Sequence, residues 1–295
     1  MNRIFSNIKE TYQKGSTLIQ LIYINSGIFI ILFLLNLVLT LFQVEKGNFI
    51  KYLVLPADID KLLTQPWSII SYMFLHTDIW HILFNMLCLY WFGKLFLQFF
   101  SAKHLRGLYL FGGICGGCLY IISLNIFPYF NPVLHQSVLL GASASVLAIM
   151  AAIAIKEPDY QVQILFIGSI RLKYIALFTV LFDLFFMLTS NSGGHLAHLG
   201  GVLAGIWFTL GLNKGHDITK WINKVLDLLS HSSKLFHKKP KMKIHYGGKQ
   251  QDYDFNAQKK ANENKINRIL EKIKQSGYGS LSSEEKKALF DTSKR

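Results

Sequence analysis

The sequence predicts an all-α, polytopic membrane protein: a bundle of six transmembrane helices followed by a soluble helical tail. Of its 295 residues, 51% are hydrophobic and 16% are charged, whereas about a quarter of the residues of a soluble protein are charged. The net charge is +14, and most of the excess of Lys and Arg lies after Lys214. Nearly neutral apolar runs before a basic tail indicate helices in lipid and a soluble C-terminal part.

Six apolar runs account for the membrane part, residues 25–213, because a helix needs about 20 residues to cross the hydrocarbon core. Lipid offers no partner to an open sheet edge, so these runs are expected to be helices. The fourth run is short, which is typical of a helix that begins below the membrane surface. The runs are Asn25–Gln43, Trp80–Phe99, Arg106–Phe127, Gly141–Lys156, Tyr174–Ser190 and His195–Asn213.

Charges in the short loops predict the orientation, since loops rich in Lys and Arg stay in the cytoplasm. The second-to-third connection contains Lys103 and Arg106, whereas the loops 128–140 and 191–194 contain neither residue type. The N-terminal arm 1–24 and the tail are therefore expected in the cytoplasm. We expect an integral protein of a bacterial plasma membrane with both termini inside.

The tail is expected to form two parts, an amphipathic helix with a basic linker over 214–260 and a small helical hairpin over 261–295. Apolar residues recur at helical spacing over 218–229, which favours a helix on the inner leaflet, where basic residues contact anionic lipid. No aromatic-interleaved motif accompanies the basic residues, so nucleic acid is not an expected partner. Ser282-Ser-Glu-Glu285 predicts a capping box before a last short helix.

Polar residues inside the predicted spans are candidates for a functional site, because polar groups in lipid are costly. His81 and Asn85 lie four residues apart on one face of the second span. Ser143 begins the fourth span, two residues after Gly141, and His198 lies in the sixth. Each alone has an ordinary structural explanation. Together they are predicted at one depth near the outer surface, which indicates a site.

The chemistry that fits these residues is nucleophilic catalysis by Ser143 with His198 as its base. A serine hydroxyl is a weak nucleophile until a base within hydrogen-bond reach removes its proton. The sequence places no carboxylate beside either residue, so we expect a dyad. Small residues let two helices approach closely, and Gly201 and Gly205 mark the face of the sixth span on which His198 lies.

Three groups are expected to stabilise the developing oxyanion: the backbone amide of Ser143, the side-chain amide of Asn85 and the ring of His81. Asp183 is the one acid deep within a span, and we interpret it as a structural hydrogen-bonding residue. His195 is expected nearer the water than His198 and without a catalytic role.

These motifs resemble those of the rhomboid family over residues 25–213. Gly141-Ala-Ser143-Ala144 is similar to the family's Gly-x-Ser-Gly nucleophile motif, and Ala144 departs from it. His198-Leu-Gly-Gly201-Val-Leu-Ala-Gly205 resembles the catalytic-histidine helix. His81-Ile-Leu-Phe-Asn85, preceded by His76, resembles the oxyanion element.

The resemblance implies a six-helix bundle with a water-filled cavity and a serine endopeptidase that cleaves transmembrane segments of other proteins. It implies no cofactor and no metal. Ile266-Asn-Arg-Ile-Leu270 and Ser282-Ser-Glu-Glu285 in the tail are similar to C-terminal extensions of some Bacteroidetes rhomboids.

Two alternatives remain open at this point. The first is a catalytically inactive rhomboid-like protein that binds membrane clients. The second is a transporter or metal-dependent membrane protein that uses His76, His81, His195 and His198. The sequence lacks the His-Glu-x-x-His motif of metalloproteases.

Overall fold

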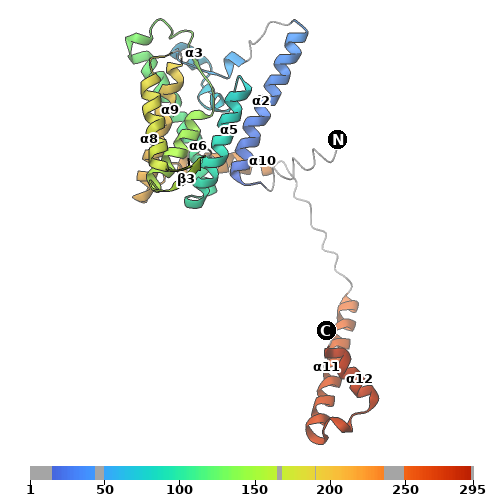
Figure 1. Ribbon diagram of the computed structural model, residues 1–295. Coiled ribbons are helices and arrows are strands. Elements are labelled where there is room, and N and C mark those ends of the chain that lie inside the picture. The colour runs from blue at the N-terminus through green and yellow to red at the C-terminus, as the bar shows by residue number, and fades with distance from the viewer. Residues whose placement is uncertain (1–14, 44–49, 165–167, 190, 236–248, 294–295) are drawn as a thin grey trace. The chain divides into compact units, whose positions relative to one another are not determined.

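The computed structural model describes residues 15–43, 50–164, 168–189, 191–235 and 249–293 (Figure 1). Most of the predicted arm 1–24 and the central part of the predicted linker, residues 236–248, lie outside the described residues. The chain divides into two compact units, Met1–Leu235 and Phe236–Arg295. Each unit is described by itself below.

The first unit is built mainly from helices. Its long helices are α2 (Thr17–Leu41), α5 (Ile79–Phe99), α6 (Ala102–Ile126), α7 (Ser143–Lys156), α8 (Leu172–Phe186), α9 (Ser192–Asn213) and α10 (Lys220–Leu235). Its short helices are α3 (Ile59–Thr64), α4 (Ser68–Ser71), η1 (Ile50–Tyr52), η2 (Tyr72–Phe74) and η3 (Pro128–Phe130).

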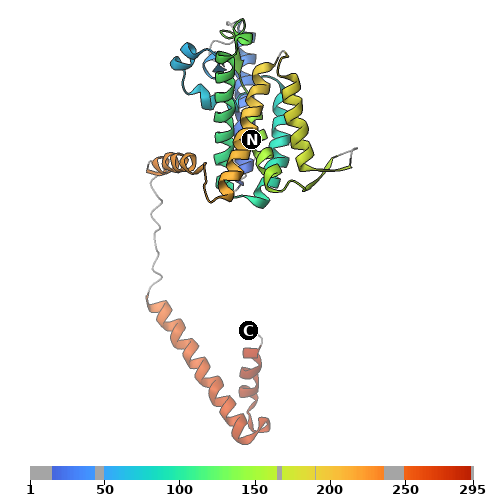
Figure 2. The same cartoon turned by 90° about the vertical axis from the view of Figure 1, so that its left-hand side faces the viewer.

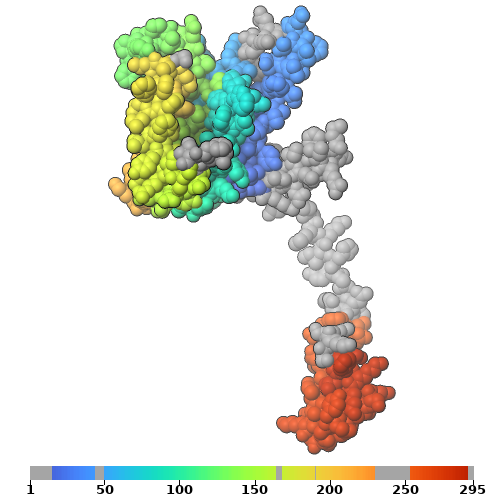
Figure 3. Space-filling view, in the orientation of Figure 1, coloured from blue at the N-terminus to red at the C-terminus, as the bar shows by residue number. Residues whose placement is uncertain are grey.

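Within the described residues, four helices are long and apolar enough to cross a membrane: α2, α5, α6 and α9. Helix α7 has 14 residues and α8 has 15, which is below the length that a straight crossing needs. Four of the six expected spans are therefore helices of full length, and a count of six crossings stays a prediction. Helices α5 and α8 lie at the surface of the bundle (Figure 3). Trp91 of α5 and Phe185 of α8 are mostly exposed, as lipid-facing apolar residues are.

The first span begins earlier than expected, at Thr17 and not at Asn25. Asn25 is compatible with the helix interior because its polar groups have partners. Its Nδ2 donates to the carbonyl of Leu21 at 2.9 Å and to the hydroxyl of Tyr109 at 3.0 Å. The expected boundary between residues 24 and 25 therefore falls within α2.

Helices α6, α7 and α9 form the centre of the bundle. Small residues bring their backbones together: a Cβ added to Gly200 would lie 2.7 Å from the carbonyl oxygen of Cys115, and one added to Gly112 would lie 2.4 Å from the Cβ of Ala148. Such contacts between small residues hold membrane helices together, since lipid provides no hydrophobic driving force between them. Helices α2, α5 and α8 pack around this centre (Figure 1).

Helix α10 lies crosswise to α6 and α9 at one end of the bundle (Figure 2). Its inner side is held by Arg106 of α6, whose Nε donates to Oδ1 of Asn223 at 2.7 Å and whose Nη2 pairs with Asp227. Ile222 is buried, whereas Trp221 and Leu228 are exposed. One face of the amphipathic helix is therefore packed against protein, and the exposed side chains of Trp221 and Leu228 are of the kind that contacts lipid.

The fold is not purely helical, because two small antiparallel sheets connect its loops. Strand β1 (Leu55–Pro56) pairs with β2 (Val138–Leu139), with Leu55 opposite Leu139. Strand β3 (Gln161–Ile164) pairs with β4 (Gly168–Arg171). The chain is mostly helical, as expected, and these short strands lie in loops at the two ends of the bundle (Figure 1).

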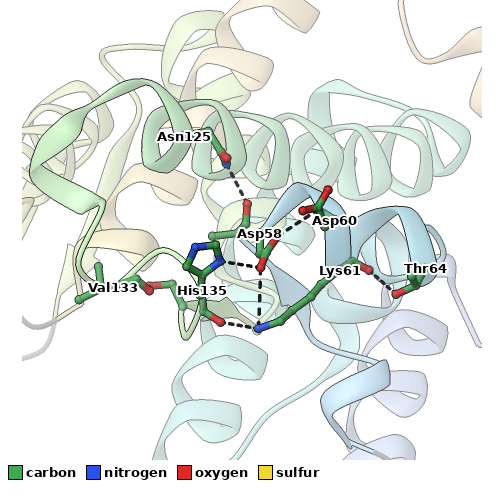
Figure 4. A network of polar contacts seen from close by, with 9 residues as sticks. Asp58, Asp60, Lys61, Thr64, Asn125, Val133 and His135 are labelled. Carbon is green, nitrogen blue, oxygen red and sulfur yellow. Dashed lines mark hydrogen bonds and ion pairs between the residues drawn. The ribbon is translucent and has the colours of Figure 1, made fainter.

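The loops near β1 and β2 are also joined by a polar network (Figure 4). Oδ2 of Asp58 lies 2.8 Å from Nδ1 of His135, and the side chain of Asn125 donates to the carbonyl of Ala57 at 2.8 Å. The hydrogen bond with His135 holds the pKa of the Asp58 carboxyl below its ordinary value. This network ties the first loop to the loop that leads into α7.

The second unit consists of α11 (Lys249–Ser276), η4 (Tyr278–Ser280) and α12 (Ser283–Ser293). The predicted capping box is present, because each backbone N–H donates to the side chain of the other residue: the Ser282 N–H to Glu285 Oε2 at 2.8 Å and the Glu285 N–H to Ser282 Oγ at 3.3 Å. The expected boundary at 260/261 falls inside α11, so part of the predicted linker is helical.

Candidate active site

Ser143 is the first residue of α7, and the turn before it depends on Gly141. Gly141 has a φ of +123°, a conformation that residues with a Cβ rarely adopt. Its N–H donates to the carbonyl of Tyr72 at 3.0 Å. A Cβ at this position would lie 2.9 Å from two atoms of the His81 ring. Gly141 therefore allows both the turn and the close approach of His81 to the start of α7.

His198 of α9 lies directly beside Ser143. Its Nε2 is 2.7 Å from the Ser143 hydroxyl oxygen, which is a hydrogen-bond distance. The two helices touch at backbone level on the following turns. A Cβ at Gly201 would lie 2.1 Å from the Ala144 carbonyl oxygen, and one at Gly205 would lie 2.2 Å from that of Ala148. Glycine at these two positions is what allows the contact between Ser143 and His198.

A carboxylate also belongs to this cluster, contrary to the expectation that none lies beside the pair. Oδ1 of Asp183 on α8 is 2.9 Å from Nδ1 of His198 and 2.8 Å from Nδ1 of His195. The expectation was wrong because it was based on residues adjacent in the sequence, whereas Asp183 reaches His198 through the packing of two helices. Helices α8 and α9 are joined by a short connection and run antiparallel, which brings Asp183 to the depth of His198.

His195 also differs from its expected surroundings. It is only 9% exposed, and its ring packs against Phe182 and Phe186 with centroid distances of 6.1 and 6.4 Å. A position nearer the water predicts an exposed ring, but α8 covers this side of α9. His195 is therefore part of the buried polar cluster.

The expected oxyanion donors surround the start of α7. Asn85 is buried, and its Nδ2 donates to the carbonyl of His81 one turn earlier at 2.9 Å. The His81 backbone N–H is fixed by the capping side chain of Asp78 at 2.8 Å. The amide of Ser143 belongs to the first turn of α7, where backbone N–H groups lack partners within the helix.

His76 lies behind His81, with 5.0 Å between the ring centroids. It is buried, and neither of its ring nitrogens has a hydrogen-bond partner among the described residues. Burial, followed by the proximity of His81, lowers the pKa of His76 to about 4. The His76 ring is therefore neutral at neutral pH and supports the position of His81 by contact.

A cavity of about 250 Å³ opens between α5, α7, α8 and α9 next to these residues. The residues that make up its polar part, called its polar end below, are Ser143, His195, His198, Asn85 and Asp183. Its remaining wall is mainly apolar and is formed by Phe84, Cys88, Phe92, Val146, Leu147, Thr179 and Phe182. Such a lining suits an apolar peptide segment with one bond held at the polar end.

Ser145 is the other serine near the start of α7, and it points elsewhere. It is fully buried, and its hydroxyl oxygen faces α6, where a Cβ added to Gly113 would lie 2.8 Å from it. Of these two serines, only Ser143 contacts His198.

Asp183, His195 and His198 also form a group that could hold a metal ion, with donor atoms within 4.8 Å of one another. His76 and His81 do not belong to this group. The distances of 2.8 and 2.9 Å from a single carboxylate oxygen to the two ring nitrogens are hydrogen-bond distances. The arrangement therefore fits two ring N–H groups that donate to one carboxylate.

Two parts of the sequence are similar to known protein families. Residues 63–214, just over half of the chain, match the rhomboid domain, and residues 249–295 match a family of unknown function, DUF6576. The presenilin-associated rhomboid-like protein, mitochondrial, of Homo sapiens is 25% identical over 171 residues, which are 56% of this chain and 41% of that protein. The RHOMBOID-like protein 12, mitochondrial, of Arabidopsis thaliana is 29% identical over 143 residues, which are 45% and 43% of the two chains.

The chain thus matches less than half of the length of each of these relatives. The match to the rhomboid domain nevertheless extends over half of this chain and includes α5 to α9, which carry the cluster described above. Together with the apolar helices, it shows that this integral membrane protein belongs to the rhomboid family.

Proposed function

We propose that the protein is an intramembrane serine endopeptidase that cleaves transmembrane segments of other membrane proteins. The observation that carries the proposal is the 2.7 Å contact between the Ser143 hydroxyl and Nε2 of His198 at the polar end of the cavity. A nucleophile within hydrogen-bond reach of a base is the arrangement that acyl transfer requires. The apolar wall of the cavity favours a substrate segment that is itself apolar.

The reaction begins when the Ser143 oxygen attacks the carbonyl carbon of the scissile peptide bond, and the hydroxyl proton passes to Nε2 of His198. The carbonyl π electrons move to the oxygen, which becomes an oxyanion. As the C–N bond breaks, His198 returns the proton to the leaving amine. Water then attacks the acyl ester, gives its proton to Nε2, and His198 finally returns that proton to Ser143 as the acid product leaves.

The oxyanion needs donors that are already in place, because donors of this kind contribute about 3–4 kcal/mol each to the transition state. The proposed donors are the Ser143 N–H, the Asn85 amide and the His81 ring. They come from two helices, α5 and α7, whose relative position is fixed by the approach of the His81 ring to Gly141.

The membrane arrangement that fits this function is six crossings, with α7 and α8 as the two short ones. Lys and Arg in the connections before α6 and before α8 favour a cytoplasmic location for those connections and for both termini. The site then faces the outer side. For this chain we propose the bacterial plasma membrane as its location, with the basic residues around α10 at anionic lipid of the inner leaflet.

Two other functions are tested by simple measurements. A rhomboid-like protein without catalysis would bind transmembrane clients and leave them intact. A metal-dependent protein would lose its function when a chelator such as EDTA is added. For a Ser143–His198 enzyme we expect EDTA to leave the rate of cleavage unchanged.

The main test is cleavage of a fluorescent transmembrane substrate by the full chain reconstituted in lipid vesicles. We expect Ser143→Ala to lower the rate by at least about a thousandfold. Ser145→Ala is the matched control, because it removes the same atom from a serine that faces α6, and it should retain most of the activity. A fluorophosphonate probe should label the wild type and not Ser143→Ala. Equal activity of the wild type and Ser143→Ala would exclude this mechanism.

A further inference from the structure

We propose that Asp183 is a positioning residue of the catalytic pair and that His195 holds Asp183 in place. The inference rests on the proposed peptidase function. It replaces a dyad with a linked series from Ser143 through His198 and Asp183 to His195, drawn from three helices.

The contacts that carry this inference are consecutive. The Ser143 hydroxyl is 2.7 Å from Nε2 of His198, and Nδ1 on the other side of that ring is 2.9 Å from Oδ1 of Asp183. The same oxygen is 2.8 Å from Nδ1 of His195. Both ring nitrogens of His198 therefore have a partner: Nε2 contacts the nucleophile and Nδ1 contacts the carboxylate.

The carboxylate decides which nitrogen of His198 carries the proton. A carboxylate accepts hydrogen bonds, so Nδ1 of His198 must be the N–H that donates to Asp183. In the neutral ring the other nitrogen, Nε2, then has a lone pair that points at the Ser143 hydroxyl. That is the tautomer a base needs, and the alternative tautomer would turn an N–H toward the nucleophile.

The burial of the Asp183 carboxylate is energetically costly, which indicates that the residue has a function. It is 2% exposed, and a carboxylate removed from water is costly unless it is paired and hydrogen-bonded. Its partners among the described residues are the two histidine rings, and Oδ2 has none there. Apart from Leu172 at its first turn, Asp183 is the buried residue of α8.

His195 supplies the second donor and fixes the carboxylate. Two donors on one oxygen restrict the orientation of the Asp183 carboxylate more than the single hydrogen bond to His198 would. The His195 ring lies nearly perpendicular to that of His198, at 85° and 6.0 Å between centroids. Phe182 and Phe186 pack against it from α8. The ring is thus held by its own neighbours and can hold Asp183 in turn.

The test compares Asp183→Asn with the wild type in the vesicle cleavage assay, with kcat and KM measured separately. Asparagine has the shape of aspartate but allows the wrong tautomer of His198, so kcat should fall by about 10²–10⁴-fold while KM stays within threefold. Asp183→Glu, which restores a carboxylate, should recover at least about tenfold of that loss. His195→Phe keeps the ring packing without the donor and should lower kcat by about tenfold.

A purely structural role for Asp183 predicts a different set of results. The melting temperature in detergent would then fall in all three variants in parallel with activity, and Asp183→Asn would lower binding and turnover together. In a Ser143→Ala background, the positioning role predicts that Asp183→Asn removes no further activity. If Asp183→Asn fails to fold, His195→Phe and Asp183→Glu report on the same contacts.

A folded Asp183→Asn with kcat within threefold of the wild type would overturn the inference and leave the Ser143–His198 enzyme standing. An active Ser143→Ala would instead overturn the proposed function itself. The two failures are therefore distinguishable in one series of variants.

Discussion

The centre and the periphery of the bundle are held together in different ways. Helices α6, α7 and α9 meet through backbone atoms, as at Gly201, where an added Cβ would lie 2.1 Å from the carbonyl oxygen of Ala144. The peripheral helices are attached by side chains, and polar side chains add to the apolar packing of residues such as Leu18 and Ile222. Asn25 joins α2 to Tyr109 of α6, and Arg106 joins α6 to Asn223 of α10.

This difference assigns different tasks to the two regions. Ser143 and His198 stand on helices whose backbones touch, so their distance changes little as long as the fold is intact. Asp183 stands on α8, where Phe178 and Phe185 are largely exposed. The centre fixes the proposed nucleophile and its proposed base, and the periphery contributes contacts that single substitutions can remove.

The largest effect is expected where the backbones touch. Gly201→Val would push a branched side chain into the Ala144 carbonyl, and overpacking of this kind costs about 1–3 kcal/mol or more. We expect a large fall in melting temperature in detergent and loss of cleavage. Gly27→Val is the matched control, because nothing lies within 4 Å of a Cβ added there. A stable and active Gly201→Val would show that α7 and α9 are not in backbone contact.

The central contact is also the part of the site that the sequence predicts well. Gly201 and Gly205 are spaced by one helical turn on the face of His198, and small residues at such spacing indicate a close helix contact. Ser143, His81 and Asn85 lie near the starts of two apolar runs, so a shared depth follows from the alternating direction of the spans. These inferences need only periodicity and the order of the helices.

The contact of Asp183 with the two histidines is harder to predict from the sequence, although the sequence contains a signal for it. Asp183 lies three residues before the end of α8 and His195 three residues after the start of α9, so the two mirror each other across a short turn. An antiparallel helix pair brings such positions together. The pairing of Leu55 with Leu139 has no comparable signal, because two-residue strands show no periodicity and lie far apart in the chain.

Removal of α10 is expected to have an intermediate effect. A chain that ends at Leu235 keeps the first unit and should retain its melting temperature and its turnover within twofold. A chain that ends at Asn213 loses the partners of Arg106 and the burial of Ile222. Hydrogen bonds to charged groups contribute about 1.5–3 kcal/mol, so we expect a melting temperature lower by about 5–10 °C. Equal melting temperatures for the two truncations would show that α10 does not stabilise the bundle.

The smallest effect is expected in the loops near β1 and β2, where Asp58 and His135 join two segments (Figure 4). The hydrogen bond with His135 lowers the pKa of Asp58 in the folded protein. A lowered pKa contributes stability that is present above the unfolded value of about 3.9 and is lost as the pH falls through the folded value. His135→Ala should therefore lower the melting temperature slightly at pH 7, and its difference from the wild type should shrink below about pH 4. Ser137→Ala changes the same loop without touching Asp58 and should show no such pH dependence. A difference that persists undiminished well below pH 4 would mean that the Asp58 carboxylate is not what the pair with His135 stabilises.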